Sequence, residues 1–194
     1  MARWLPRTLA GQAVALQVAV VLVIVVAGSV LAVFDARADA NRAARDQVSA
    51  VAVSLADAPS TAAALQSGDP TAALQPTTEQ VRADTGIAFI TIMNTAGVRY
   101  THTNPAFIGG RYLGTIAPTM RGEVHTETYT GTLGPSIRTI APVRDSSGRV
   151  IGAVAAGITQ STLTESWVSR LQLIGAVSAA TLIVALAGLW AIRR

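Results

Sequence analysis

Long uncharged stretches stand near both ends of the chain, and shorter apolar periods fill the residues between them. From residue 8 to residue 34 no side chain is charged, and the run VALQVAVVLVIVVAGSVLAV can cross about 30 Å of hydrocarbon as one helix. A second uncharged run covers residues 171–192, with Trp190 near its end as an interfacial aromatic. A cleaved signal peptide has an apolar region of only about 7 to 15 residues, so the first run favours an uncleaved anchor. The pattern predicts transmembrane helices at residues 12–34 and 171–192.

The segment that follows the first apolar run has helical periodicity. Val48, Val51 and Leu55 recur at helical spacing, which predicts a helix that continues out of the membrane and ends before Pro59. Short helical pieces are expected over residues 60–75, interrupted by a Gly-Asp-Pro sequence. A capping-box pattern then opens the stretch TTEQVRADTG, whose last glycine is typical of a helix end.

From residue 87 onward, five runs have the β-branched or alternating composition of strands: residues 87–93, 98–102, 123–129, 136–143 and 150–158. The turn NTAG joins the first two as a hairpin, and the turns GTLG and DSSG separate the last three. A short helix is expected near residues 116–120. The whole segment is large enough for one hydrophobic core and too small for two. The sequence therefore predicts one mixed α/β domain, with five strands behind a long N-terminal helix.

The distribution of charge predicts the orientation in the membrane. The chain has a formal charge of +4, with fifteen arginines, eleven acidic residues and no lysine. Residues 35–170 hold eleven charges of each sign, so the excess comes from two arginines before the first apolar run and two after the second. Arginines beside a span stay in the cytoplasm. Residues 1–11 and 193–194 are therefore predicted to be cytoplasmic, and residues 35–170 to be an extracytoplasmic domain on the inner or plasma membrane. The excess of arginine is therefore explained by the orientation in the membrane, and no nucleic-acid partner is expected.

The residue types exclude several kinds of chemistry. The absence of cysteine excludes disulfides and thiolates, and the absence of lysine excludes a Walker-type phosphate loop and a Schiff base. Neither His102 nor His125 has a partner at metal-ligand spacing, no Gly-x-Ser-x-Gly element is present, and no carboxylate pair stands out within the strand region. No catalytic site, metal or cofactor is predicted. His125 lies in an alternating polar run and is interpreted as a solvated edge residue, and both histidines lie on the side predicted to be away from cytosolic ATP.

Binding is the favoured class of function. Arg99 and His102 stand three apart in RYTHTNP, and Arg138 is central in the run GTLGPSIRTIAPV. The guanidinium fork matches a carboxylate, a protonated histidine adds a donor, and two arginines at one cavity suit a small dianion. The alternative for each arginine is a side chain that lies along the sheet surface with its charge in water. On a regular strand, residues 99 and 102 face opposite sides, so one pocket can take both only if the strand bends or ends before the Asn-Pro turn.

Three motifs occur in order: Arg-x-x-His-x-Asn-Pro after a hairpin turn, Gly-x-Leu-Gly-x-x-x-Arg, and Pro-Val-x-Asp-x-x-Gly-x-x-x-Gly. They lie in FITIMNTAGVRYTHTNPAFIGG and GTLGPSIRTIAPVRDSSGRVIGAVAAGIT. In these motifs, residues 87–159 resemble the extracytoplasmic sensor domain of the citrate and C4-dicarboxylate receptor kinases, the CitA/DcuS type. The resemblance implies a PAS-like or single-Cache fold, a five-stranded antiparallel sheet with a long N-terminal helix, flanked by two transmembrane helices.

The resemblance also implies a set of ligand contacts. The family positions that contact the ligand match Thr91, Arg99, His102, Thr132, Leu133 and Arg138. Citrate receptors carry a lysine where this chain has Ile140 and a serine where it has Ala155. Each replacement removes a hydrogen-bond donor, so a third carboxylate would be poorly compensated. A C4-dicarboxylate such as malate, fumarate or succinate is therefore favoured over citrate.

What the resemblance implies for the whole protein is a homodimeric sensor histidine kinase that signals through its second transmembrane helix to a cytoplasmic response regulator. The kinase part is not among these 194 residues, and an excised fragment and a natural truncation both stay open. Two alternatives remain as well. The chain could be a membrane-anchored dimerisation or interaction module that binds no metabolite, or the sensor of a chemoreceptor or of a cyclic-nucleotide-making enzyme. The sequence beyond Arg194 would distinguish the kinds of output.

Overall fold

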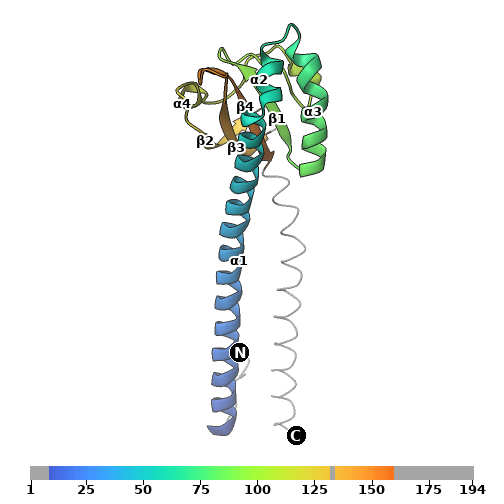
Figure 1. Cartoon of the computed structure of the whole chain (residues 1–194). Helices are drawn as coiled ribbons and strands as arrows, with labels where there is room; N and C mark the ends of the chain where they lie inside the picture. Colours follow the sequence, from blue (N-terminus) through green and yellow to red (C-terminus); the bar gives the residue numbers. More distant parts are fainter. Residues whose placement is uncertain (1–8, 132–133, 160–194) are drawn as a thin grey trace. The chain divides into compact units, whose positions relative to one another are not determined.

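The computed structural model describes residues 9–131 and 134–159 (Figure 1). Three helices come first: α1 (Leu9–Asp57), α2 (Pro59–Leu65) and α3 (Pro70–Thr85). The elements that follow are β1 (Phe89–Asn94), the 3-10 turn η1 (Pro105–Phe107), α4 (Ala117–Met120), β2 (His125–Gly131), β3 (Gly134–Arg144) and β4 (Val150–Thr159). Residues 9–39 belong to one compact unit and residues 40–159 to another.

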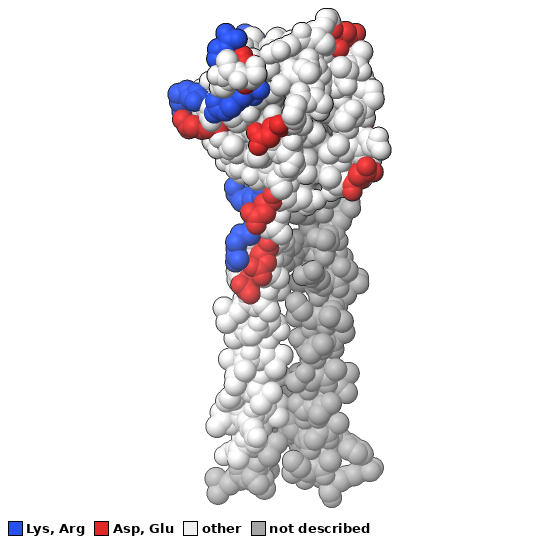
Figure 2. Space-filling view, viewed as in Figure 1, with Lys and Arg blue, Asp and Glu red and all other residues white. Residues whose placement is uncertain are grey.

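The first unit contains the apolar part of α1. Leu16, Leu31 and Phe34 expose 68%, 69% and 63% of their surfaces. Residues 9–34 carry no charged side chain, and Figure 2 shows the lower length of this helix as uncharged surface. Among the described residues, α1 is the one helix long and apolar enough to cross a membrane. The second predicted span, residues 171–192, lies outside the described residues.

The second unit is built on an antiparallel sheet whose strands lie in the order β1-β4-β3-β2. Successive side chains of a strand point to opposite faces, so the sheet has two different surfaces. One surface, the helix-covered face, packs Ile92, Ile137 and Val154 against Val48 and other residues of α1, α2 and α3. The predicted helical period is confirmed, since Val48 is completely buried and α1 ends at Asp57.

The other surface, the loop-covered face, lies under the segment that leads from β1 to β2. Its apolar part consists of Met93, Ile140, Ala153 and Ala155, with Tyr112, Ile116 and Met120 from the covering segment packed against them. The expected short helix is confirmed as α4, which contacts β3 and β4. This face also receives Thr91 and Arg138, because Thr91 pairs with Ala155, and Arg138 lies two residues before Ile140.

The helix predicted from the capping box does not begin where that pattern stands. The side chain of Asp69 accepts a hydrogen bond from the backbone of Ala72 at 3.0 Å, and Pro70 takes the first helical position. Helix α3 therefore starts at Pro70, includes the capping-box residues in its interior and ends at Thr85. Gly86 follows as the C-cap residue, and its φ of 68° is favourable for glycine.

Four strands, not five, are present among the described residues. The segment expected as the second strand makes only isolated bridges, from Arg99 to Met93 and from Val98 to Arg111.

At the other side of the sheet, β3 is longer than β2. The pairing with β2 ends at Ile140, whose carbonyl accepts a hydrogen bond from the Thr119 hydroxyl at 3.3 Å, and the free part of β3 contains Pro142.

Candidate functional site

Arg138 is a buried cation in the middle of the loop-covered face. Strand β3 places it opposite Glu127 of β2 and Gly157 of β4, and its exposed fraction is 2%. Its Nε donates to Oε1 of Glu127 at 2.8 Å, and Nη2 lies 2.7 Å from the same oxygen. The guanidinium also lies against two aromatic rings, 4.1 Å from the centroid of Tyr129 and 4.9 Å from that of Tyr112. The expectation that this arginine is not solvated is confirmed.

Two donor atoms, one on Arg138 itself and one on a neighbouring tyrosine, are buried without a hydrogen-bond acceptor in the described part of the chain. Nη2 of Arg138 is close to Glu127, but the contact is ionic because the geometry does not satisfy a hydrogen bond. The hydroxyl of Tyr112 is the second. Burial raises the pKa of this hydroxyl well above its usual range, although the charges of Arg138 and Arg99 oppose the shift. Buried polar groups normally find partners, so the pair marks a place where an acceptor atom would be stabilised.

The backbone bends between Arg99 and His102. The backbone N–H of Ile92 donates to the hydroxyl of Thr101 at 2.8 Å, where a regular ladder would use a carbonyl. The carbonyl of Ile92 accepts from both Tyr100 at 2.8 Å and Thr101 at 3.3 Å, so two residues stand opposite one. This bend is the reason that the fifth strand is reduced to bridges. It also removes the alternation that would have placed residues 99 and 102 on opposite sides.

Arg99 and His102 meet at the ring of Phe107. The guanidinium carbon of Arg99 lies 5.6 Å from the ring centroid, and the imidazole centroid of His102 lies 5.2 Å from it. The exposed fractions of Arg99 and His102 are 5% and 3%. Nε of Arg99 donates to the carbonyl of Gly110 at 3.3 Å, and Nη2 donates to the carbonyl of Arg111. The segment that covers the sheet therefore fixes the first cation.

Helix α3 and the Asn-Pro turn fix the histidine. Gln75 accepts from the backbone N–H of His102 at 3.0 Å and donates to its carbonyl at 2.9 Å. Nδ1 of the imidazole accepts from the backbone N–H of Asn104 at 2.9 Å. Burial lowers the pKa of His102, and the charge of Arg99 lowers it further. The Asn104 backbone and Glu79 act in the opposite direction.

Arg99 and Arg138 both lie near Tyr112. The charges of both act on its hydroxyl, and the backbone N–H of Tyr112 donates to the carbonyl of Gly97 in the hairpin turn at 2.8 Å. Burial lowers the pKa of Arg99 and Tyr112 acts against that shift. Arg99, Arg138 and Tyr112 therefore form one cluster on the loop-covered face, with His102 next to Arg99.

The other expected contacts are distributed unevenly. Thr91 is buried at 2% exposure and lies on the same face as Arg138. Thr132 and Leu133 lie outside the described residues. Ile140 and Ala155 are neighbours in the β3–β4 register and are completely buried on this face, so neither position offers a donor.

Sequence reasoning missed one member of this cluster, Tyr112, and the ion-pair partner of Arg138, Glu127. Tyr112 belongs to an irregular segment, and only the path of that segment brings the ring over the sheet. Glu127 stands in the polar run HTETYTG, and its meaning depends on the register that places it opposite Arg138. His125 lies on the edge strand as expected, but its Nε2 is 3.6 Å from Oε2 of Glu127.

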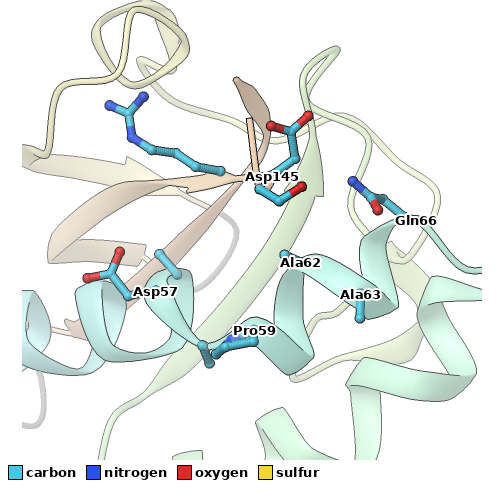
Figure 3. Close-up of a pocket in the computed structure, with 10 residues that line it drawn as sticks. Asp57, Pro59, Ala62, Ala63, Gln66 and Asp145 are labelled. Carbon is cyan, nitrogen blue, oxygen red and sulfur yellow. The ribbon is translucent and has the colours of Figure 1, made fainter. Parts of the chain in front are cut away.

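A hollow of about 470 Å³ lies elsewhere in the second unit (Figure 3). It is lined by Asp57 of α1, by Pro59 and Ala62 of α2 and by Gln66 just after α2. Asp145 lines it from the turn after β3. The carboxylate of Asp145 is engaged by Ser147 and Arg149 of its own turn. The residues described by the structure contain no group of three His, Cys, Asp or Glu side chains that could hold a metal ion.

A four-stranded antiparallel sheet with a long N-terminal helix on one face and a buried polar cluster under a loop on the other defines a PAS-like sensor domain of the Cache type. The sequence model of the family described as single cache domain 3 matches residues 35–172, and the chain belongs to that family.

Named relatives agree with this assignment. Sensor protein CitS of Halalkalibacterium halodurans is 34% identical over 157 residues, which cover 77% of this chain and 29% of CitS. Sensor histidine kinase DcuS of Escherichia coli K12 is 31% identical over 117 residues, which cover 60% of this chain and 22% of DcuS. The chain thus spans less than a third of the length of these relatives.

Solved structures give the same fold. The E. coli DcuS sensor domain matches with a TM-score of 0.61 and 28% identity, over 65% of this chain and 96% of that domain. The sensor domain of the Vibrio cholerae histidine kinase DctB matches with a TM-score of 0.60 and 14% identity, over 69% of this chain and 55% of that domain, and supports the fold alone. The family resemblance seen in the sequence is confirmed.

Proposed function

We propose that this chain is the transmembrane input module of a two-component sensor histidine kinase and binds a small di- or tricarboxylate outside the membrane. The observation that carries the proposal is the cluster of buried donors on the loop-covered face. Arg99 and Arg138 are both cations with less than a tenth of their surface exposed, and Tyr112 adds a hydroxyl with no acceptor among the described residues. Buried cations are costly unless anions compensate them, and a small anion with two carboxylates would do so.

Within this class of ligand, a C4-dicarboxylate is favoured over citrate. Arg99 with His102 would hold one carboxylate, and Arg138 with Tyr112 the other. Thr91 and the two residues outside the described ranges, Thr132 and Leu133, would complete the contacts. A third carboxylate would meet the apolar side chains at positions 140 and 155, which supply no hydrogen bond.

The rest of the proposal concerns the membrane and the output. Residues 12–34 and 171–192 would cross the lipid bilayer, with residues 35–170 outside and residues 1–11 and 193–194 in the cytoplasm. Ligand binding would tighten the sheet on β4 and displace the second membrane helix, which requires the ligand to prefer one of two states. A homodimer, a histidine kinase part and a cytoplasmic response regulator complete the system.

The test is ligand binding by the 194-residue chain in lipid nanodiscs. Malate, succinate, fumarate and citrate are titrated calorimetrically and screened by thermal shift. A ligand at 100 times its dissociation constant should stabilise the domain by about 2.7 kcal/mol. The variant Arg138→Ala should lose binding by about 2 to 5 kcal/mol, because it removes the buried partner of one carboxylate.

The control is Arg121→Ala, which removes an exposed arginine that pairs only with nearby Glu123 in the described residues. It should bind like the unaltered chain. Unchanged affinity in a folded Arg138→Ala variant would contradict the proposed site.

A second candidate is an interaction module that binds no metabolite. The observation that favours it is the ion pair of Arg138 with Glu127, which already compensates this cation without a ligand. In that case no carboxylate would shift the melting temperature, and the chain would still form dimers in the membrane.

A further inference from the structure

Glu127 places a carboxylate of the protein itself where a ligand carboxylate would bind. Its side chain has 13% exposure, and Oε1 contacts both Nε and Nη2 of Arg138 at 2.8 and 2.7 Å. The same oxygen accepts a hydrogen bond from the backbone N–H of Thr115 at 3.3 Å. Burial would raise the pKa of Glu127, but the hydrogen bond and charge of Arg138 hold it below its usual range. Glu127 is therefore ionised at neutral pH.

The covering segment closes over this ion pair. A Cβ atom added at Gly114 would overlap Nη2 of Arg138 and would lie 2.9 Å from Oε1 of Glu127. The rings of Tyr112 and Tyr129 contact the guanidinium as well. The nitrogens of Arg138 that face Glu127 are thus enclosed by the protein, and a second carboxylate can reach them only if Glu127 moves away.

We infer that Glu127 competes with the ligand for Arg138. It thereby sets the affinity of the site and determines how much a second ligand carboxylate adds to that affinity. This inference rests on the proposed carboxylate-binding function. In the empty domain, Glu127 neutralises Arg138 and holds Thr115 of the covering segment. A dicarboxylate has to replace Glu127, and the displaced side chain gives up its contact with Thr115. A ligand with one carboxylate can bind beside Arg99 and His102 without this exchange.

Removal of the charge at position 127 should therefore have two opposite effects. The empty domain should become less stable, because a buried arginine loses its partner. Dicarboxylate binding should become tighter, because no internal anion has to be displaced. We expect a gain of about tenfold or more, as is typical for a hydrogen-bonded charged group. The affinity for a monocarboxylate should change less than about twofold, since that ligand does not need Arg138.

The experiment compares succinate with succinamate, in which an amide replaces one carboxylate. Both are titrated calorimetrically into the full 194-residue chain in nanodiscs, with melting temperatures recorded with and without ligand. The variants are Glu127→Gln and, as a matched control, Glu123→Gln, which alters an exposed carboxylate two residues before β2. Glu127→Thr is a second form, because threonine already occupies the neighbouring positions 126 and 128 of the strand.

The expected result is tighter succinate binding, nearly unchanged succinamate binding and a lower melting temperature without ligand in both Glu127 variants. Weaker or unchanged succinate binding in a folded variant, while the unaltered chain binds succinate and Arg138→Ala does not, would overturn the inference and leave the proposed function intact. Equal gains for both ligands would also overturn it. If neither the unaltered chain nor the Glu127 variants bind any carboxylate, the proposed function fails and this inference fails with it. Binding by the Glu127 variants alone would support the inference strongly.

Discussion

His102 is held in a state that a ligand could change. Its pKa is lowered by burial and by Arg99, so the imidazole of the empty site is mainly neutral at pH 7. A carboxylate placed beside the ring would favour the protonated form, and binding would take up a proton. Nδ1 lies 2.9 Å from the backbone nitrogen of Asn104 and 3.1 Å from its carbonyl oxygen, so either protonation state finds a partner.

This linkage predicts the sign of a pH dependence. Affinity should be constant below the pKa of the empty site and should fall by up to about tenfold per pH unit between the pKa values of the empty and occupied sites. Calorimetry over about pH 6 to 8, in two buffers of different ionisation enthalpy, measures the proton uptake directly. His102→Gln should remove the uptake. Proton uptake that persists in this variant would assign it to another group.

At the same scale, the sequence indicated candidate residues by their type and by their local motifs. Arg99, His102 and Arg138 stand in local motifs, and the structure places all three in buried positions around one segment. Tyr112 and Glu127 could not be predicted in this way. A tyrosine in a loop and a glutamate in a polar strand have ordinary surface roles in most proteins, and only the three-dimensional contacts change that interpretation.

Among the structural elements, the segment after the NTAG turn depends on one hydroxyl. Thr101 supplies the acceptor for the N–H of Ile92, and this side-chain bond replaces a strand ladder. Thr101→Val keeps the shape of the side chain but leaves that buried N–H without its acceptor, which should lower the free energy of unfolding by about 1 to 3 kcal/mol. Denaturant unfolding measures the change.

The same variant should also weaken carboxylate binding, because the bend brings Arg99 and His102 to one side. Thr95→Val, at an exposed position of the same hairpin, is the matched control and should leave both quantities unchanged. A loss of stability without a loss of affinity would separate the bend from the site.

The periodicity of the sequence predicted most elements with good boundaries. The end of α1, helix α4 and four strands follow from apolar spacing and turn residues. The prediction of a fifth strand was wrong because a hydrophobic pattern does not indicate a hydrogen bond made by a side chain. The helix start predicted from the capping box was wrong because Asp69 and Pro70 begin the same helix earlier.

For the molecule as a whole, the charge distribution predicts the orientation in the membrane. It separates residues 35–170, with balanced charge, from ends that carry only arginine. The chain has no cysteine, so one introduced thiol is a clean topology probe. Ser146→Cys, at an exposed position of the β3–β4 turn, should react with a membrane-impermeant maleimide on intact cells.

Ala2→Cys, in the predicted cytoplasmic segment, should react only after the cells are opened. Labelling of position 2 on intact cells would reverse the proposed orientation and, with it, the side on which a metabolite is sensed.

The order of the strands in the second unit, by contrast, could not be predicted, because it depends on cross-strand register, which a single sequence does not contain.

The part of β3 that extends beyond β2 has no partner strand on one side among residues 9–131 and 134–159. Ile140 directs its carbonyl to that side, and residues two apart in a strand direct their backbone groups the same way, so Pro142 stands there without an N–H to offer. The covering segment occupies this side instead, since Pro142 is buried and the neighbouring Arg144 donates through Nη2 to the carbonyl of Gly122 at 2.9 Å. The proline therefore leaves no buried donor to satisfy where a loop, and not a strand, lies beside the sheet.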